Sequence, residues 1–187
     1  MPKRAIPDHA IKVFWWVMFD VRHREQELFD GSITTFEAVA RENTSCVFAV
    51  QWDKLIMCYQ KQPQDTERYR DFPWWRVPRW KDMLAHAQLE LKEETWMISN
   101  DREEYVSYDV WGKVHATIKY YIVRNVKQIT HQSLDPWGEI IEVKSLDFET
   151  MIDMVMQWKL GDVYLRNDIL LMKIEGRLWD FKKELFG

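Results

Sequence analysis

Residues 72–97, FPWWRVPRWKDMLAHAQLELKEETWM, contain the stretch that decides the fold. The second half of this stretch has four apolar residues at helical spacing, with neither Gly nor Pro between them: Met83, Leu84, Ala87 and Leu91. The spacing predicts a helix over 82–95. The preceding residues 60–79 are polar, contain three prolines, and predict an irregular functional loop or pair of loops.

Strand-like segments lie on both sides of this helix. Alternating or β-branched runs predict strands at 13–21 and 24–29 (two strands or one bent strand), 33–40, 46–50, 54–59, 104–109, 113–124 and 140–143. Turns are predicted at residues 30–32, 51–53 and 135–138. Amphipathic helices are predicted at 148–158, 162–175 and 178–186, with Gly161 and Gly176 as C-caps. Because strands and helices do not alternate regularly, the order predicts an α+β fold, a mixed sheet between helices (α/β/α).

The composition limits the class of protein. The 187 residues fit one domain, and 47% hydrophobic residues are enough to form a core. With 26 Lys+Arg against 30 Asp+Glu, the net charge of −4 provides no global basic field for nucleic acid or an anionic membrane. No apolar run is long enough to span a membrane. Cys46 and Cys58 predict buried, inert thiols in a reducing, cytoplasmic compartment.

Three glutamates form a cluster that points to metal chemistry. Glu90, Glu93 and Glu94 lie at i, i+3 and i+4 of the predicted helix, so their carboxylates project from one face. They also occupy its last turns, where the helix macrodipole disfavours negative charge by about 0.3–1 kcal/mol each. A divalent cation such as Mg²⁺ or Mn²⁺ would compensate this repulsion. An ordinary solvated acidic face is the alternative that stays open.

The same stretch resembles the Nudix box, G-x5-E-x7-R-E-U-x-E-E-x-G-U, in which U is an aliphatic residue. Five specified positions fit this pattern: Glu90, Leu91, Glu93, Glu94 and Met97. The flanking residues 25–36, 42–50, 60–63 and 161–176 resemble the ADP-ribose pyrophosphatase branch of the Nudix hydrolase family. The chain is therefore similar to this family over most of its length.

The resemblance implies a Nudix fold and a metal-dependent site. Glu90, Glu93 and Glu94 would be the Mg²⁺ ligands, with Glu93 and Glu94 also counted as catalytic residues. The carbonyl groups near Trp74 and Trp75 are candidates for a further ligand.

The implied reaction is hydrolysis of the diphosphate in a nucleoside diphosphate sugar such as ADP-ribose. The resemblance places a general base on a later loop, where Glu139 is the first candidate and Glu142 the second. Arg76 and Arg79 are the candidates for binding substrate phosphate through bidentate contacts.

Four box positions depart from the pattern. Trp75 and Trp96 stand where the pattern has its two glycines. Lys81 stands where it has its first Glu, and Leu89 where it has its Arg. Lys81 and Leu89 together remove a supporting ion pair, and loss of such support often costs about 10–100-fold in metal affinity or activity. We therefore expect reduced activity, and a catalytically inactive Nudix-fold protein that binds a nucleotide or a protein partner remains the alternative.

Tryptophan is abundant where glycine is expected: the chain has 11 Trp and 6 Gly. Eight tryptophans occupy positions where relatives or turn chemistry would place glycine: Trp16, Trp52, Trp74, Trp75, Trp80, Trp96, Trp137 and Trp158. Glycine is used there because a positive φ or a close backbone approach is required. We hypothesise that the gene encodes glycine by UGA and that this sequence translates UGA as tryptophan.

The chain divides into two regions. Residues 1–40 are N-terminal strands and a candidate region for dimerisation, whereas residues 41–187 form the expected Nudix domain with its C-terminal helices. The expected partners are a nucleoside diphosphate sugar and a second copy of the chain, and neither nucleic acid nor a membrane is expected.

Overall fold

The computed structural model describes residue 6 and residues 9–16, 18–61, 67–110, 112–129 and 140–187. The strands are β1 (Ile11–Trp15), β2 (Phe19–Glu27), β3 (Ile33–Arg41), β4 (Asn43–Gln51), β5 (Lys54–Lys61), β6 (Tyr69–Asp71), β7 (Trp74–Val77), β8 (Met97–Ile98), β9 (Asp101–Asp109), β10 (Val114–His115), β11 (Thr117–Arg124), β12 (Lys127–Gln128) and β13 (Ile140–Leu146). The helices are α1 (Met83–Thr95), α2 (Phe148–Met156), α3 (Val163–Ile174) and α4 (Leu178–Phe186).

A mixed sheet forms the body of the molecule. Its order within the described residues is β13-β5-β4-β11-β9, with β6 paired to β5 and β7 paired to β4. The β4 and β11 strands run parallel, whereas their other neighbours are antiparallel. Most residues of β4 and β5 are buried because helices cover both faces of the sheet.

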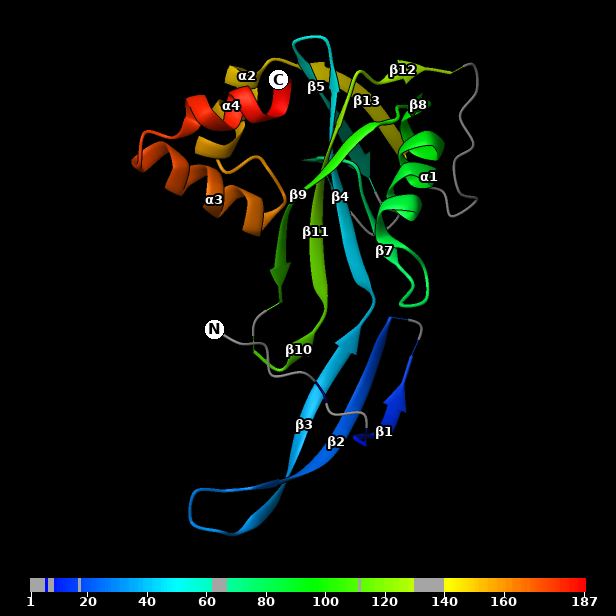
Figure 1. Ribbon diagram of the computed structural model, residues 1–187, viewed down its shortest axis with the longest axis vertical. Coiled ribbons are helices and arrows are strands. Elements are labelled where there is room, and N and C mark those ends of the chain that lie inside the picture. The colour runs from blue at the N-terminus through cyan, green and yellow to red at the C-terminus, as the bar shows by residue number, and fades with distance from the viewer. Residues whose placement is uncertain (1–5, 7–8, 17, 62–66, 111, 130–139) are drawn as a thin grey trace.

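Figure 1 shows α1 on one side of this sheet and α2, α3 and α4 on the other. Phe48 of β4 packs in a core with Met151 of α2 and Phe181 of α4. The preceding Val47 points to the opposite face and belongs to a second core with Leu91 of α1. The predicted α+β class with α/β/α layers is confirmed. Among the described residues, no helix combines the length and the apolar character needed to cross a membrane.

A second sheet projects from the body as an arm, which consists of β1, β2, β3 and β10 (Figure 1). β2 and β3 form a long antiparallel hairpin that reverses at the predicted turn, where Gly31 has a φ of 82°. Figure 1 shows no helix against this sheet in the described part of the chain. Most side chains of β1, β2 and β3 are therefore exposed or half-buried.

The predicted helix over 82–95 is confirmed as α1. Asp82 is its N-cap residue, and the Asp82 carboxylate accepts a hydrogen bond from the Ala85 N–H at 2.7 Å. The three predicted C-terminal helices are also present as α2, α3 and α4. Periodicity and capping act over a few residues, which explains why these helices could be predicted locally.

Strand prediction was less accurate. The N-terminal break lies between Trp15 and Phe19, inside the apolar run, and the charged residues after Val21 belong to β2. These charges are tolerated because the arm is exposed to solvent. The predicted strand over 113–124 is two strands: β10 pairs with β3 in the arm, and β11 pairs with β4 in the body.

The prediction of a wholly irregular segment over 60–79 was wrong. It contains β6, which pairs with β5, and β7, which pairs with the first half of β4. These short strands complete the sheet, so tertiary pairing overrides a local sequence that is polar and rich in proline. The turn predicted at 135–138 lies outside the described residues.

The end of α2 differs from the predicted glycine cap. Its C-cap is Gln157, and Trp158 takes the left-handed conformation that follows, with a φ of 59°. Gly161 has no positive φ and is needed for a different reason, because a Cβ atom there would lie 2.9 Å from Asp71 Oδ2. Gly176 does end α3 as predicted, with a φ of 73°.

The tryptophan hypothesis is only partly supported by the backbone. Trp52, Trp96 and Trp158 have φ values of 59–60°, a region that non-glycine residues seldom occupy. Trp16, Trp74, Trp75 and Trp80 do not have a positive φ, so the expected strain is absent at these positions. In particular, Trp74 and Trp75 lie in β7, where extended backbone suits a large aromatic residue. Trp137 lies outside the described residues.

Asp71 is a buried carboxyl group at the end of β6. Burial, reinforced by the nearby charge of Asp162, raises the pKa of Asp71 well above its ordinary 3.8, although Asp71 Oδ1 accepts a hydrogen bond from the Phe72 N–H at 2.9 Å. A raised pKa means that the folded state holds this proton more tightly than the unfolded state does. The stability contribution is therefore complete below 3.8 and is lost as the pH rises through the raised pKa.

We expect Asp71→Asn to stabilise the fold at pH 8 by about 1–3 kcal/mol, because an amide keeps the acceptor oxygen without a buried charge. The gain should shrink toward zero as the pH approaches 4. Urea unfolding at pH 8 and pH 4.5 measures both values. Asp30→Asn is the matched control: Ser32 hydrogen bonds lower the pKa of Asp30, so its substitution should destabilise at pH 8. A gain for Asp71→Asn that is equal at both pH values would contradict the assignment.

Candidate functional site

The three candidate metal ligands lie on the last turns of α1. Glu90, Glu93 and Glu94 are each partly buried. The helix packs on β4, β7 and β8, and its own C-cap is Trp96. The structure thus places the three carboxylates on one short helical segment beside the body sheet, on the side opposite α2, α3 and α4 (Figure 1).

Glu94 faces the sheet. Its Oε2 atom is inaccessible to solvent. Burial raises the pKa of the Cys58 thiol well above 9.0, and the charge of Glu94 adds to this effect. A fully solvated acidic face therefore does not describe this side of α1. Both cysteines are free and buried, as predicted.

His86 connects α1 to the strand before it. The buried His86 Nε2 lies 3.1 Å from the Arg76 carbonyl oxygen and 3.4 Å from Glu90 Oε1. One ring nitrogen thus contacts both β7 and a candidate metal ligand one helical turn away. Sequence reasoning gave His86 no role, although its i, i+4 spacing to Glu90 was a usable signal.

The described residues contain no group of three or more His, Cys, Asp and Glu side chains that converges on a metal position. The donor set nevertheless suits Mg²⁺, because three carboxylates supply the hard oxygen ligands that this ion prefers. The three glutamates also lie on one face of α1, which is the backbone placement that a shared metal ion would need. Binding would require the flexible glutamate side chains to rotate toward one another.

The two candidate phosphate-binding residues lie just before α1. Arg76 is exposed on β7, and Arg79 is exposed in the following turn, where its Nη2 donates to the Arg41 carbonyl oxygen at 3.4 Å. Lys81 and Leu89, which replace the ion pair of the box, are also exposed, so their substitution leaves no buried charge unpaired.

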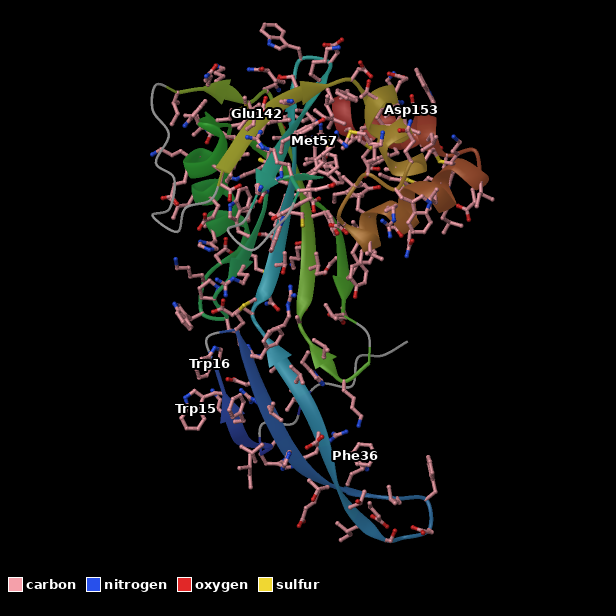
Figure 2. The ribbon with its side chains drawn as sticks, turned by 180° about the vertical axis from the view of Figure 1, so that it is seen from behind. Trp15, Trp16, Phe36, Met57, Glu142 and Asp153 are labelled. Atoms are coloured by element: carbon pink, nitrogen blue, oxygen red, sulfur yellow. The ribbon has the colours of Figure 1, made fainter. Side chains whose placement is uncertain are left out.

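The two candidate bases have different outcomes. Glu139 lies outside the described residues. Glu142 is exposed on β13 (Figure 2) and forms ion pairs with Arg68 at 2.7 Å and Lys144 at 3.2 Å. Glu142 is therefore a surface acid whose carboxylate is paired with two cations.

Trp74 and Trp75, whose carbonyl groups were candidate ligands, lie in β7 opposite Cys46 and Ser45.

The comparisons with known proteins bear on the fold. No model of a known protein family matches the chain, and no curated protein sequence is similar to it. A crystal structure of an ADP compounds hydrolase, a Nudix enzyme, has a similar fold, with a TM-score of 0.70 and 16% sequence identity. The match covers 91% of this chain and 95% of that chain. The chain therefore has an α+β Nudix fold.

Proposed function

We propose that this protein hydrolyses the diphosphate of a nucleoside diphosphate sugar, such as ADP-ribose, with Mg²⁺ or Mn²⁺. The observation that carries the proposal is the position of Glu90, Glu93 and Glu94 on one face of α1 in a Nudix fold. The similarity to an ADP compounds hydrolase supports the choice of substrate class.

The residues have distinct proposed roles. Glu90, Glu93 and Glu94 would hold the metal, which when bound neutralises phosphate charge and lowers the pKa of water. Arg76 and Arg79, exposed on the segment before α1, would bind and orient the phosphates. Glu139 is the proposed base that takes the proton from the attacking water.

The direct test is an assay of the purified chain with ADP-ribose, with Mg²⁺, with Mn²⁺ or with a chelator. Addition of water across the diphosphate yields AMP and ribose 5-phosphate, which chromatography separates. We expect both products only when a divalent metal is present. The proposed activity is refuted if neither metal supports product formation.

The second candidate function is a Nudix-fold protein that binds a nucleotide or a protein partner without hydrolysing the nucleotide. Two observations favour it: the carboxylates do not converge, and Lys81 and Leu89 replace the supporting ion pair of the box. Saturable binding of ADP-ribose without product formation would identify this function.

His86 should support the metal site through Glu90. We expect His86→Phe, which fills the buried space but cannot contact Arg76 O or Glu90 Oε1, to weaken Mn²⁺ binding by about 10–100-fold. His86→Gln should retain part of the affinity, because its amide can still donate. Titration followed by Mn²⁺ electron paramagnetic resonance measures each affinity. Equal affinities for the wild type and the Phe variant would remove this role.

We also propose that a second copy of the chain covers the outer side of the arm. Four aromatic residues of this region expose between 41% and 73% of their surface: Phe14, Trp15, Trp16 and Phe19. At about 150–250 Å² per aromatic side chain, they present roughly 500 Å² of apolar surface. This is more than half of the roughly 800 Å² that each partner buries in a standard interface.

The edge of the arm favours a second copy as the occupant. Among the described residues, β1 is the terminal strand of its sheet, and Figure 2 shows Trp15 and Trp16 beside it, on the side away from β3. An exposed apolar edge strand is a template for pairing. Two copies of one strand can pair antiparallel about a two-fold axis.

The double variant Phe14→Glu, Trp15→Glu should therefore be a monomer, because like charges would meet across the axis. We expect the wild type to have a mass near twice 22.8 kDa by light scattering after gel filtration. Trp179→Glu on α4, where the tryptophan is 71% exposed, is the matched control and should remain dimeric. A monomeric wild type at micromolar concentration would contradict the proposal.

A further inference from the structure

A cluster of titratable side chains lies where the body sheet meets α3. It consists of Cys46 from β4, Asp71 from β6, Tyr120 from β11 and Asp162, the N-cap residue of α3. The Tyr120 hydroxyl donates a hydrogen bond to Asp162 Oδ2, and Cys46 Sγ lies 3.9 Å from the same oxygen. The proposed hydrolysis uses none of these groups, so the cluster is independent of the α1 site.

The connection between α2 and α3 lies against β6. The Gly161 N–H donates to the Arg70 carbonyl oxygen at 3.1 Å, and Leu160 forms a parallel bridge with Arg70. Asp71 faces this connection so closely that a Cβ atom on Gly161 would lie 2.9 Å from Asp71 Oδ2. Asp162 follows directly, and its charge acts on Asp71. We call Asp71 and residues 160–162 together the β6–α3 junction.

The two carboxyl groups of the junction differ in their hydrogen-bond donors. Asp162 accepts from three groups: the Tyr120 hydroxyl, the Cys46 thiol and the Leu165 N–H. Asp71 is buried, and within the described part of the chain its printed donor is the Phe72 N–H at 2.9 Å. Donors stabilise a carboxylate, whereas burial disfavours it. Asp71 is therefore the member of the pair that holds a proton more readily.

The groups around Asp71 do not offset a negative charge. The titratable side chains that face it come from four elements: Cys46 of β4, Cys58 of β5, Tyr120 of β11 and Asp162 of α3. None of these is a cation. The Arg70 guanidinium carbon lies 5.0 Å from the centroid of the Tyr59 ring. That of Arg166 lies 4.2 Å from the centroid of the Trp158 ring. Ionisation of Asp71 would thus place a second negative charge in the junction.

We propose that the β6–α3 junction is a pH-sensitive switch: protonated Asp71 allows residues 160–162 to lie against β6, and loss of its proton releases them together with the first turn of α3. Release lets the Asp71 carboxylate reach water and move away from Asp162, which removes both the desolvation cost and the repulsion. The switch lies on the opposite side of the sheet from α1, and the proposal does not rest on the proposed hydrolysis.

The direction of the switch follows from linkage. In the released state Asp71 would ionise near its ordinary pKa of 3.8, whereas burial and the charge of Asp162 raise its pKa in the closed state. The closed state is therefore favoured at low pH. Between these two pKa values, the ratio of released to closed molecules rises by about tenfold for each pH unit.

The test is hydrogen exchange of the full chain at pH 5 and pH 8, followed by nuclear magnetic resonance. Three amides report on the junction through their hydrogen bonds: Gly161, Leu165 and Arg166. Their protection factors, corrected for the intrinsic effect of pH on exchange, should fall at least about tenfold from pH 5 to pH 8. At pH 8 they should change little in about 1 M urea, because local release exposes little surface, whereas the Leu91 amide in α1 should exchange faster.

Two variants assign the switch to the pair of carboxyl groups. Asp71→Asn cannot ionise, so the protection factors should be equal at both pH values. Asp162→Asn keeps the helix cap, since Asn and Asp cap equally well, but removes the opposing charge. The fall should then be smaller but still present, because Asp71 stays buried. Asp153→Asn, an exposed position on α2 (Figure 2), is the matched control and should show the wild-type fall.

Four results would overturn the proposal. The first is a wild-type chain in which the three reporter amides are equally protected at pH 5 and pH 8. The second is a fall that persists in Asp71→Asn, and the third is a fall that Asp162→Asn leaves unchanged. The fourth is acceleration of the reporter amides by urea to the same extent as the Leu91 amide, which would mean that they exchange only through global unfolding. Thermal melts confirm that each variant is folded.

Discussion

Glu93→Gln should lower the rate of Mg²⁺-dependent ADP-ribose hydrolysis by roughly 10²–10³-fold. The substitution retains the size of the side chain but removes one of three carboxylates on the same face of α1. Metal-based charge stabilisation is worth several kcal/mol, and each 1.36 kcal/mol corresponds to about tenfold in rate. Steady-state kinetics with ADP-ribose, together with an Mn²⁺ titration, would measure both losses.

The control for this experiment is Glu149→Gln. Glu149 is an exposed acid on α2, paired with Lys182 at 2.6 Å, on the other side of the body sheet from α1 (Figure 1). Its substitution should leave turnover and metal affinity unchanged. If Glu93→Gln remained as active as the wild type, the assignment of the α1 glutamates as metal ligands would be wrong.

The triple variant Trp52→Gly, Trp96→Gly, Trp158→Gly should be more stable than the chain as it stands, by roughly 2–3 kcal/mol. A left-handed backbone costs a non-glycine residue about 1–2 kcal/mol. Glycine removes this strain, but it also increases the entropy of the unfolded chain, which lowers the stability by about 0.4–1 kcal/mol. The strain is the larger effect, so we expect a net gain near 1 kcal/mol per site.

The three sites should not contribute equally. Trp52 is 87% exposed, so its removal sacrifices little packing. Trp96 is partly buried and its indole Nε1 is buried without a hydrogen-bond partner among the described residues, so its replacement removes a second penalty. Replacing Trp158 should stabilise the fold least, because the centroid of its ring lies 4.2 Å from the Arg166 guanidinium carbon, and the glycine variant loses this contact, worth about 0.5–1 kcal/mol.

Thermal unfolding measures the total, which should appear as a rise in Tm of about 5–10 °C for a chain of this length. Trp179→Gly is the matched control: this tryptophan is 71% exposed, close to the 69% of Trp158, but it lies in a helix, so glycine there should lower Tm slightly. A triple variant that melts at or below the wild-type temperature would contradict the strain argument. Separately, UGG codons at the eight tryptophan positions would refute the codon hypothesis.

The sequence of residues 72–97 determined more of the candidate site than of the sheet around it. The apolar spacing after Asp82 predicted α1, and the same spacing placed Glu90, Glu93 and Glu94 on one face. The i, i+4 spacing allowed a contact between His86 and Glu90, but it gave no indication of the contact with the Arg76 carbonyl oxygen, because β7 approaches α1 only through its pairing with β4. Glu139, the proposed base, stays a prediction.

The order of helices and most strands, the capping of α1 by Asp82 and the α+β class were determined by the sequence itself, since they depend on residues a few positions apart. Only the tertiary structure decided that residues 113–124 divide between arm and body, that polar residues near Pro73 form strands, and that Asp71 is buried beside Gly161. These features arise from hydrogen bonds and packing between segments distant in the chain, and local spacing carries no record of such partners.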